Sequence, residues 1–251
     1  MNASDWIVLA IAGLLLASMP AFGVVARRRP RDPDVARRPA TALLGHWLRD
    51  WFVWAVSPIE RTAIRLRVPP DAFNVAGAAC GLAAGAAYAL DALPTAGGLV
   101  VAGGLADVLD GRIARAQGTV TGRGAFLDST LDRFAESFAL LGVVLYFSGR
   151  PLFVITAAAA LAGSLLVSYA RARGEAAGAS IKGGLMQRAE RLVLLALASL
   201  ADPLATDAAG WPDGTVLGAA LLLIACGSFG TATWRTVAVA RALTRGGNPG
   251  A

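Results

Sequence analysis

Long apolar runs separated by short charged stretches dominate the pattern of this chain. Seven runs are predicted to span a bilayer, at residues 6–25, 71–90, 94–109, 124–147, 151–170, 183–200 and 215–242. A helix needs roughly 20 apolar residues to cross the hydrocarbon core of a membrane. The pattern therefore predicts an all-α fold, a polytopic membrane helix bundle with six core transmembrane helices and one extra transmembrane helix at the N-terminus.

The stretch 41–68 differs from these runs because its apolar positions recur with a helical period among charged ones. Leu44, Trp47, Trp51 and Trp54 fall on one side of such a helix, with basic residues elsewhere around the axis. Tryptophan beside basic side chains is typical of the lipid headgroup region. We therefore expect an interfacial amphipathic helix here, with a soluble core helix as the alternative.

These boundaries divide the chain into four segments. Residues 1–40 form an N-terminal transmembrane anchor and a basic, proline-containing linker, residues 41–68 the interfacial helix, residues 69–245 the membrane domain, and residues 246–251 a tail. A cleaved signal peptide is the alternative for the first run. It is disfavoured because no basic residue precedes the run, whereas several arginines follow it.

The distribution of charge predicts the orientation. If the N-terminus lies outside, nearly every Lys and Arg falls on the cytoplasmic side, with Arg133 and Arg150 as the exceptions. The chain is 56% hydrophobic and only 16% charged, which excludes an ordinary soluble domain. We therefore expect a multi-pass protein of the cytoplasmic (inner) membrane that contacts membrane lipids and, despite a net charge of +6, no nucleic acid.

Three glycines recur at every fourth position of the second run, namely Gly77, Gly81 and Gly85. Small residues at this spacing allow another helix backbone to approach closely. The row predicts close helix packing within the chain, with a dimer face as the alternative.

Four aspartates lie at the ends of two apolar runs. Asp107 and Asp110 lie at the end of the third run, and Asp128 and Asp132 lie near the start of the fourth. Charged side chains at membrane depth are costly, so their presence indicates a function. Ordinary ion pairing between helices is the alternative.

Helical spacing places each acidic pair on one face of its helix. Asp107 and Asp110 are three positions apart, and Asp128 and Asp132 are four apart. Two helices joined by a short polar turn are expected to be antiparallel neighbours, so the acidic faces can converge on one cavity. Gathered carboxylates repel one another unless cations neutralise them, and such oxygen ligands suit Mg²⁺, Mn²⁺ or Ca²⁺. The spacing therefore predicts a divalent metal site.

This stretch resembles, position for position, the signature of the CDP-alcohol phosphatidyltransferase family, D-x2-D-G-x2-A-R-x8-G-x3-D-x3-D. The eight fixed positions are Asp107, Asp110, Gly111, Ala114, Arg115, Gly124, Asp128 and Asp132. The resemblance implies a membrane enzyme in which an alcohol attacks the diphosphate of a CDP-linked lipid such as CDP-diacylglycerol and CMP is released. It also implies a homodimer.

The resemblance further assigns roles to residues. Asp107, Asp110, Asp128 and Asp132 would hold Mg²⁺, or Mn²⁺, at two sites, and Asp132 would also be the catalytic base. The residues expected at the CDP moiety are Asp107, Asp110, Gly111, Ala114, Arg115, Gly124 and Asn74. Asn74 departs from the pattern, because the family usually has Thr at this position.

The acceptor alcohol is predicted from shorter matches. The segments LDSTLDR, SYARARGE and RAER resemble the branch of the family that makes phosphatidylinositol phosphate from inositol phosphate. By that resemblance Arg173, Arg191 and Arg235 would bind the acceptor phosphate. Glycerol 3-phosphate, as in phosphatidylglycerophosphate synthases, is the main alternative acceptor, followed by inositol and serine. An ion-coupled transporter and an inactive scaffold are the alternative classes of function.

Overall fold

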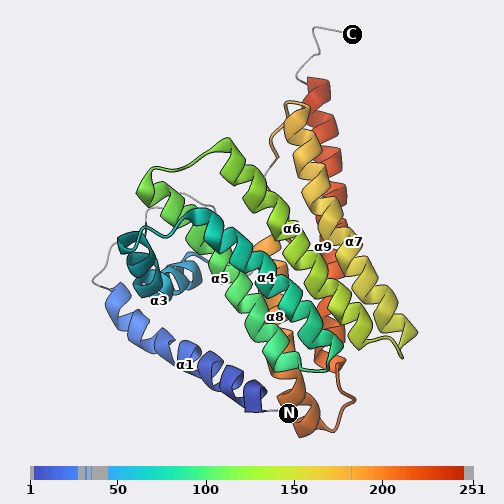
Figure 1. Ribbon diagram of the computed structural model, residues 1–251. Coiled ribbons are helices and arrows are strands. Elements are labelled where there is room, and N and C mark those ends of the chain that lie inside the picture. Colours follow the sequence, from blue (N-terminus) through green and yellow to red (C-terminus); the bar gives the residue numbers. More distant parts are fainter. Residues whose placement is uncertain (1–2, 28–31, 33–34, 36–44, 182, 246–251) are drawn as a thin grey trace.

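The computed structural model describes residues 3–27, 32, 35, 45–181 and 183–245, and this part of the chain is helical without strands (Figure 1). The helices are α1 (Ala3–Ala26), α3 (His46–Arg65), α4 (Pro70–Ala89), α5 (Leu93–Gln117), α6 (Gly122–Tyr146), α7 (Pro151–Ala176), α8 (Arg188–Ala209) and α9 (Thr215–Arg245). The predicted all-α bundle is confirmed. Most of the predicted basic linker and the predicted tail lie outside the described residues.

Six of the described helices are long and apolar enough to cross a membrane. They are α1, α4, α5, α7, α8 and α9. Large apolar side chains such as Leu14, Leu152 and Ile155 are exposed on the outside of the bundle, as expected for a surface that faces lipid. The chain is therefore a multi-pass integral membrane protein. The seventh predicted span, α6, is long enough at 25 residues, but its charged residues reduce its apolar character.

Helix α4 packs closely against both α5 and α6, and the glycine row makes this possible. A Cβ on Gly81 would lie 2.6 Å from the Cβ of Ala135 on α6, and a Cβ on Gly85 would collide with the Phe138 carbonyl. Gly142 of α6 meets the Gly85 backbone in the same way. The prediction of close packing within the chain is thus confirmed, and this packing holds α6 along a membrane-spanning helix.

We expect Gly85→Ala to separate α4 from α6. A methyl group there has no room beside the α6 backbone, and overpacking of this kind costs about 1–3 kcal/mol. The midpoint of thermal inactivation in detergent should fall, whereas Gly13→Ala in α1, where nothing lies within 4 Å of a new Cβ, should leave it unchanged. Equal midpoints for the two variants would contradict the packing described here.

Helix α1 is docked onto the bundle at both of its ends. Near its start, the buried carboxylate of Asp5 accepts hydrogen bonds from the Thr95 hydroxyl at 2.8 Å and the Thr95 N–H at 3.3 Å. Towards its end, the Trp51 indole N–H of α3 donates to the Ser18 hydroxyl at 3.0 Å. The extra N-terminal helix therefore contacts the first turn of α5 and helix α3, so it takes part in the packing of the bundle.

Candidate active site at the turn between α5 and α6

Local capping shapes the turn that joins the two halves of the signature. Gly118 follows the last residue of α5 with φ 68°, a left-handed conformation that glycine adopts without steric cost. Thr121 then caps α6, because its hydroxyl accepts the Gly124 N–H at 3.1 Å. The start of α1 and this turn lie at opposite ends of the bundle (Figure 1).

Three of the four predicted aspartates converge. Each of Asp107, Asp110 and Asp128 offers a carboxylate oxygen, and these oxygens lie within 4.8 Å of one another. Asp110 is buried, and Oδ1 of Asp128 is buried without a hydrogen-bond partner among the described residues. A gathered set of carboxylates with an unsatisfied buried oxygen fits a divalent cation, because a cation both neutralises the charges and takes up the free lone pairs.

The fourth aspartate, Asp132, is not part of this close group and is joined to it by an arginine. Arg188, at the start of α8, pairs with Asp107 and with Asp132 at 2.8 Å each. Its Nε is buried without a partner in the described part of the chain. Arg188 therefore ties α8 to both signature helices. In the sequence it was visible only as one of several basic residues at the inner end of an apolar run.

The residues expected at the CDP moiety lie on α4, α5 and α6. Gly111 and Ala114 are half-buried on α5 beside the acids, and Arg115 is exposed on the next turn. A Cβ on Gly111 would lie 3.2 Å from a guanidinium nitrogen of Arg115, so the glycine leaves room for that side chain. Gly124 is half-buried at the start of α6, whereas Asn74 is buried in α4. Their contact with CDP remains a prediction.

The three arginines expected to bind the acceptor phosphate have different surroundings. Arg191 is buried and makes a bidentate pair with Glu136, through Nε at 2.6 Å and NH2 at 2.9 Å. Arg235 is also buried and donates to the carbonyls of Gly183 and Val167 at 2.9 Å each.

Arg173 is exposed near the end of α7. Of the three arginines, it alone presents an exposed side chain, and the phosphate-binding role of all three remains a prediction.

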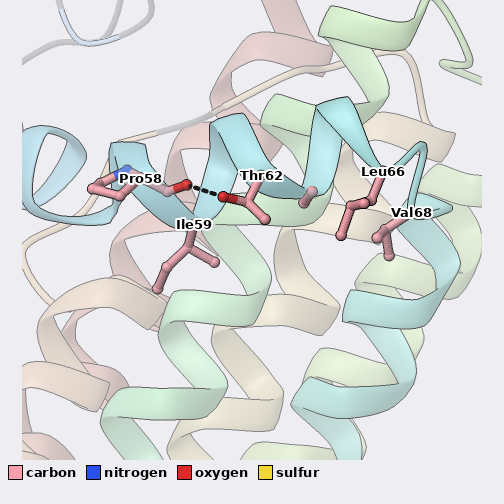
Figure 2. Close-up of a pocket in the computed structure, with 6 residues that line it drawn as sticks. Pro58, Ile59, Thr62, Leu66 and Val68 are labelled. Atoms are coloured by element: carbon pink, nitrogen blue, oxygen red, sulfur yellow. Dashed lines mark hydrogen bonds between the residues drawn. The ribbon is translucent and has the colours of Figure 1, made fainter.

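An apolar groove of about 400 Å³ runs along the second half of α3 (Figure 2). It is lined by Pro58, Ile59, Thr62, Ala63, Leu66 and Val68. The Thr62 hydroxyl donates to the Pro58 carbonyl at 2.9 Å, so the lining offers little to a polar ligand. The groove contains none of the signature residues and is separate from the acidic cluster.

The fold and the site together are those of a multi-pass membrane protein with a carboxylate cluster that could hold a metal ion. A profile of the CDP-alcohol phosphatidyltransferases matches residues 67–225, which is more than half of the chain. The chain therefore belongs to the CDP-alcohol phosphatidyltransferase family and is a transferase of phospholipid biosynthesis.

Two curated relatives are named for related reactions. The phosphatidylinositol phosphate synthase of Streptomyces avermitilis is 34% identical over 225 residues, which cover 87% of this chain and 89% of the relative. The archaetidylinositol phosphate synthase of Methanothermobacter thermautotrophicus is 38% identical over 143 residues, 57% of this chain and 72% of the relative.

Solved structures agree with this relationship. The Mycobacterium tuberculosis phosphatidylinositol phosphate synthase with CDP-DAG bound is 30% identical with a TM-score of 0.64, covering 73% of this chain and 92% of that protein. The same enzyme in complex with manganese and citrate covers 72% of this chain and 87% of that protein, with the same TM-score of 0.64. A homologous enzyme thus binds a divalent cation, in agreement with the carboxylate cluster described here.

Proposed function

We propose that this protein transfers the phosphatidyl group of CDP-diacylglycerol to an inositol phosphate and releases CMP. The observation that carries the proposal is the convergence of Asp107, Asp110 and Asp128, with Asp132 held beside them by Arg188. The relatives named for phosphatidylinositol phosphate synthesis support the choice of acceptor.

Asp107, Asp110 and Asp128 would hold Mg²⁺ at two sites, with Asp132 as the further ligand. Mn²⁺ could replace Mg²⁺, since both prefer oxygen ligands. A bound divalent cation would neutralise the diphosphate and the charge that develops on the departing CMP. Arg115 would add a planar guanidinium, which contacts phosphate oxygens in a bidentate manner.

The acceptor hydroxyl would attack the phosphorus that carries the diacylglycerol. The new P–O bond forms as the bond to CMP breaks, and the hydroxyl proton passes to the carboxylate of Asp132. Arg188 lies 2.8 Å from Asp132 and would orient that carboxylate beside the cluster. Direct transfer, without a covalent enzyme intermediate, requires no nucleophilic side chain.

The acceptor phosphate would be bound by Arg173, Arg191 and Arg235. The Arg173 side chain is exposed and would contact a soluble acceptor before the two buried arginines do. Arg191 and Arg235 already bind Glu136 and two backbone carbonyls, so the acceptor phosphate would have to share or displace those contacts.

The membrane arrangement follows from the distribution of charge. We propose a location in the inner membrane, with the active site facing the cytoplasm and the N-terminus outside. We also propose a homodimer. The surface of Gly81 and Gly85 is occupied by α6 within the chain, so a dimer would use another face.

The test is CMP release by the purified protein with Mg²⁺ and CDP-diacylglycerol, using inositol 1-phosphate, glycerol 3-phosphate, inositol and serine in separate reactions. We expect release with inositol 1-phosphate and a phosphorylated inositol lipid as product. Release with another acceptor alone would overturn the choice of acceptor. If folded protein released no CMP with any of the four acceptors, the choice of CDP-diacylglycerol as donor would be overturned.

A further inference from the structure

Arg112 lies in the signature segment, yet it faces away from the acidic cluster. It follows Asp110 by two positions, which is about 200° around an α-helix, so the two side chains leave opposite sides of the same turn. The family pattern leaves this position unspecified, and the proposed reaction does not use it. Its guanidinium group is nevertheless bound by two carboxylates.

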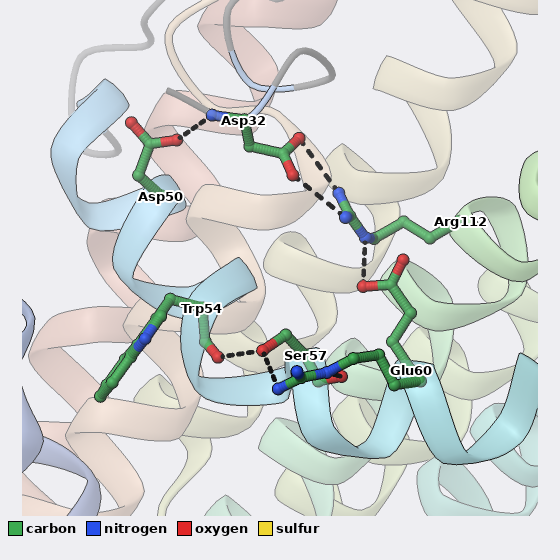
Figure 3. Close-up of polar contacts among 7 residues, drawn as sticks. Asp32, Asp50, Trp54, Ser57, Glu60 and Arg112 are labelled. Carbon is green, nitrogen blue, oxygen red and sulfur yellow. Dashed lines mark hydrogen bonds and ion pairs between the residues drawn. The ribbon is translucent and has the colours of Figure 1, made fainter. Parts of the chain in front are cut away.

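Three groups of the Arg112 guanidinium are engaged by two carboxylates (Figure 3). NH1 and NH2 donate to the two oxygens of Asp32 at 3.2 and 3.1 Å, and Nε donates to Oε2 of Glu60 at 2.9 Å. The side chains are only 13–14% exposed, so these ion pairs are largely shielded from water. Asp32 belongs to the N-terminal linker and Glu60 to α3. Arg112 thus joins three segments that are distant in sequence.

Apolar contacts continue this attachment along the same face of α5. Leu109 and Ile113, which flank Arg112 on the helix, are buried against Val56 and Ala63 of α3. One turn further, the Gln117 side-chain amide donates to the Val68 carbonyl at 3.1 Å. The last three turns of α5, which carry the metal-ligand candidates on one side, are therefore held by α3 on the other.

The N-terminal segment fixes α3 and the linker in turn. The Phe22 ring of α1 lies 5.6 Å from the rings of Trp47 and Trp54, and the Asp32 N–H donates to Oδ1 of Asp50 at 3.2 Å. Helix α1, Asp32 and α3 are therefore connected to one another behind the acidic turn.

We infer that Arg112 is a positioning residue, which acts with Asp32 and Glu60 to hold the turn of α5 that places Asp107 and Asp110 against Asp128. The inference rests on the proposed function in that these acids bind a divalent cation. It means that Asp32 of the linker and Glu60 of α3 contribute to the affinity of the site for metal.

The direction in which Arg112→Gln changes metal affinity separates a positioning role from a purely electrostatic one. Arg112→Gln removes a cation near an acidic cluster, and a purely electrostatic role would therefore tighten metal binding. Loss of positioning would weaken it, by roughly tenfold, if Arg112 acts like other residues that orient metal ligands. Arg112→Lys should be intermediate, because a single ammonium cannot engage both carboxylates as the guanidinium does.

The affinity for Mn²⁺ can be measured without turnover by adding Mn²⁺ to metal-stripped protein and monitoring the EPR signal of the free ion. We expect weaker binding in Arg112→Gln and in Glu60→Gln, and no additional loss in the double variant, since the two residues act as a unit. Arg61→Gln is the matched control, because Arg61 is the next residue of α3, is exposed and, within the described part of the chain, donates hydrogen bonds to Ser57 of the same helix. Thermal midpoints identify variants that fail to fold.

Unchanged or tighter Mn²⁺ binding in folded Arg112→Gln would overturn the inference, as would an equal loss in Arg61→Gln. Failure of the proposed function would look different. Wild-type protein would then bind Mn²⁺ at the cluster but release no CMP, whereas a wild-type protein that bound no Mn²⁺ would overturn both.

Discussion

Asp128→Asn should lower divalent-dependent CMP release by about a thousandfold, since a catalytic cation contributes several kcal/mol and each 1.36 kcal/mol is a factor of ten. The reason is geometric. Asp128 supplies the carboxylate from α6 that meets Asp107 and Asp110 of α5, and one of its buried oxygens has no partner among the described residues. An amide there would leave a cation with one fewer negative ligand.

The same substitution should not destabilise the protein in the absence of metal. Removing one of three crowded carboxylates relieves repulsion, so the thermal midpoint in EDTA should be equal or higher. Asp71→Asn is the matched control, because Asp71 is a 43% exposed acid whose pair with Arg123 lies outside the cluster. Activity that survives in Asp128→Asn, or that falls equally in Asp71→Asn, would contradict the role assigned to the cluster.

Arg191→Met is expected to have the largest effect on stability, about 3–5 kcal/mol, because it strands a buried carboxylate. Arg191 and Glu136 are both at most 5% exposed and are bound to each other at 2.6 and 2.9 Å. The double variant Glu136→Gln with Arg191→Met should recover much of the loss, since no unpaired charge then remains. Thermal inactivation in detergent measures both.

The exposed Arg173 provides the comparison for this pair. Arg173→Met should leave the thermal midpoint unchanged, because its side chain is exposed. It should raise the KM for inositol phosphate, because it removes a proposed ligand of the acceptor phosphate. If Arg191→Met instead kept its stability and changed only the acceptor KM, the pair with Glu136 would be of minor structural importance, and only the proposed phosphate-binding role of Arg191 would remain.

The bundle and the acidic cluster could be predicted from the sequence because both depend on local periodicity. Helical spacing alone places Asp107 and Asp110 on one face, and a short turn returns Asp128 to the same end. The expectation that α5 and α6 would be close neighbours was only partly right. Both helices pack mainly on α4, through the glycine row, and their acidic ends still converge.

Long-range partners could not be predicted in the same way. The pairs of Arg188 with Asp107, Arg191 with Glu136 and Arg112 with Asp32 join residues between 55 and 81 positions apart. Their spacing along the chain does not indicate which acids these arginines pair with. The first helix was likewise expected to serve only as an anchor. Its buried contacts are made by single residues, Asp5 and Phe22, and the apolar character of the whole run does not reveal them.

The most direct test of the central claim is the stoichiometry of metal-dependent transfer by the purified wild-type protein. With CDP-diacylglycerol and inositol 1-phosphate, the account predicts one CMP for each phosphorylated inositol lipid formed, and no CMP after the divalent cations are chelated. The activity should return when Mg²⁺ is added. CMP release that persists without divalent cations would contradict the account, as would ion flux across sealed vesicles without turnover of the CDP-lipid.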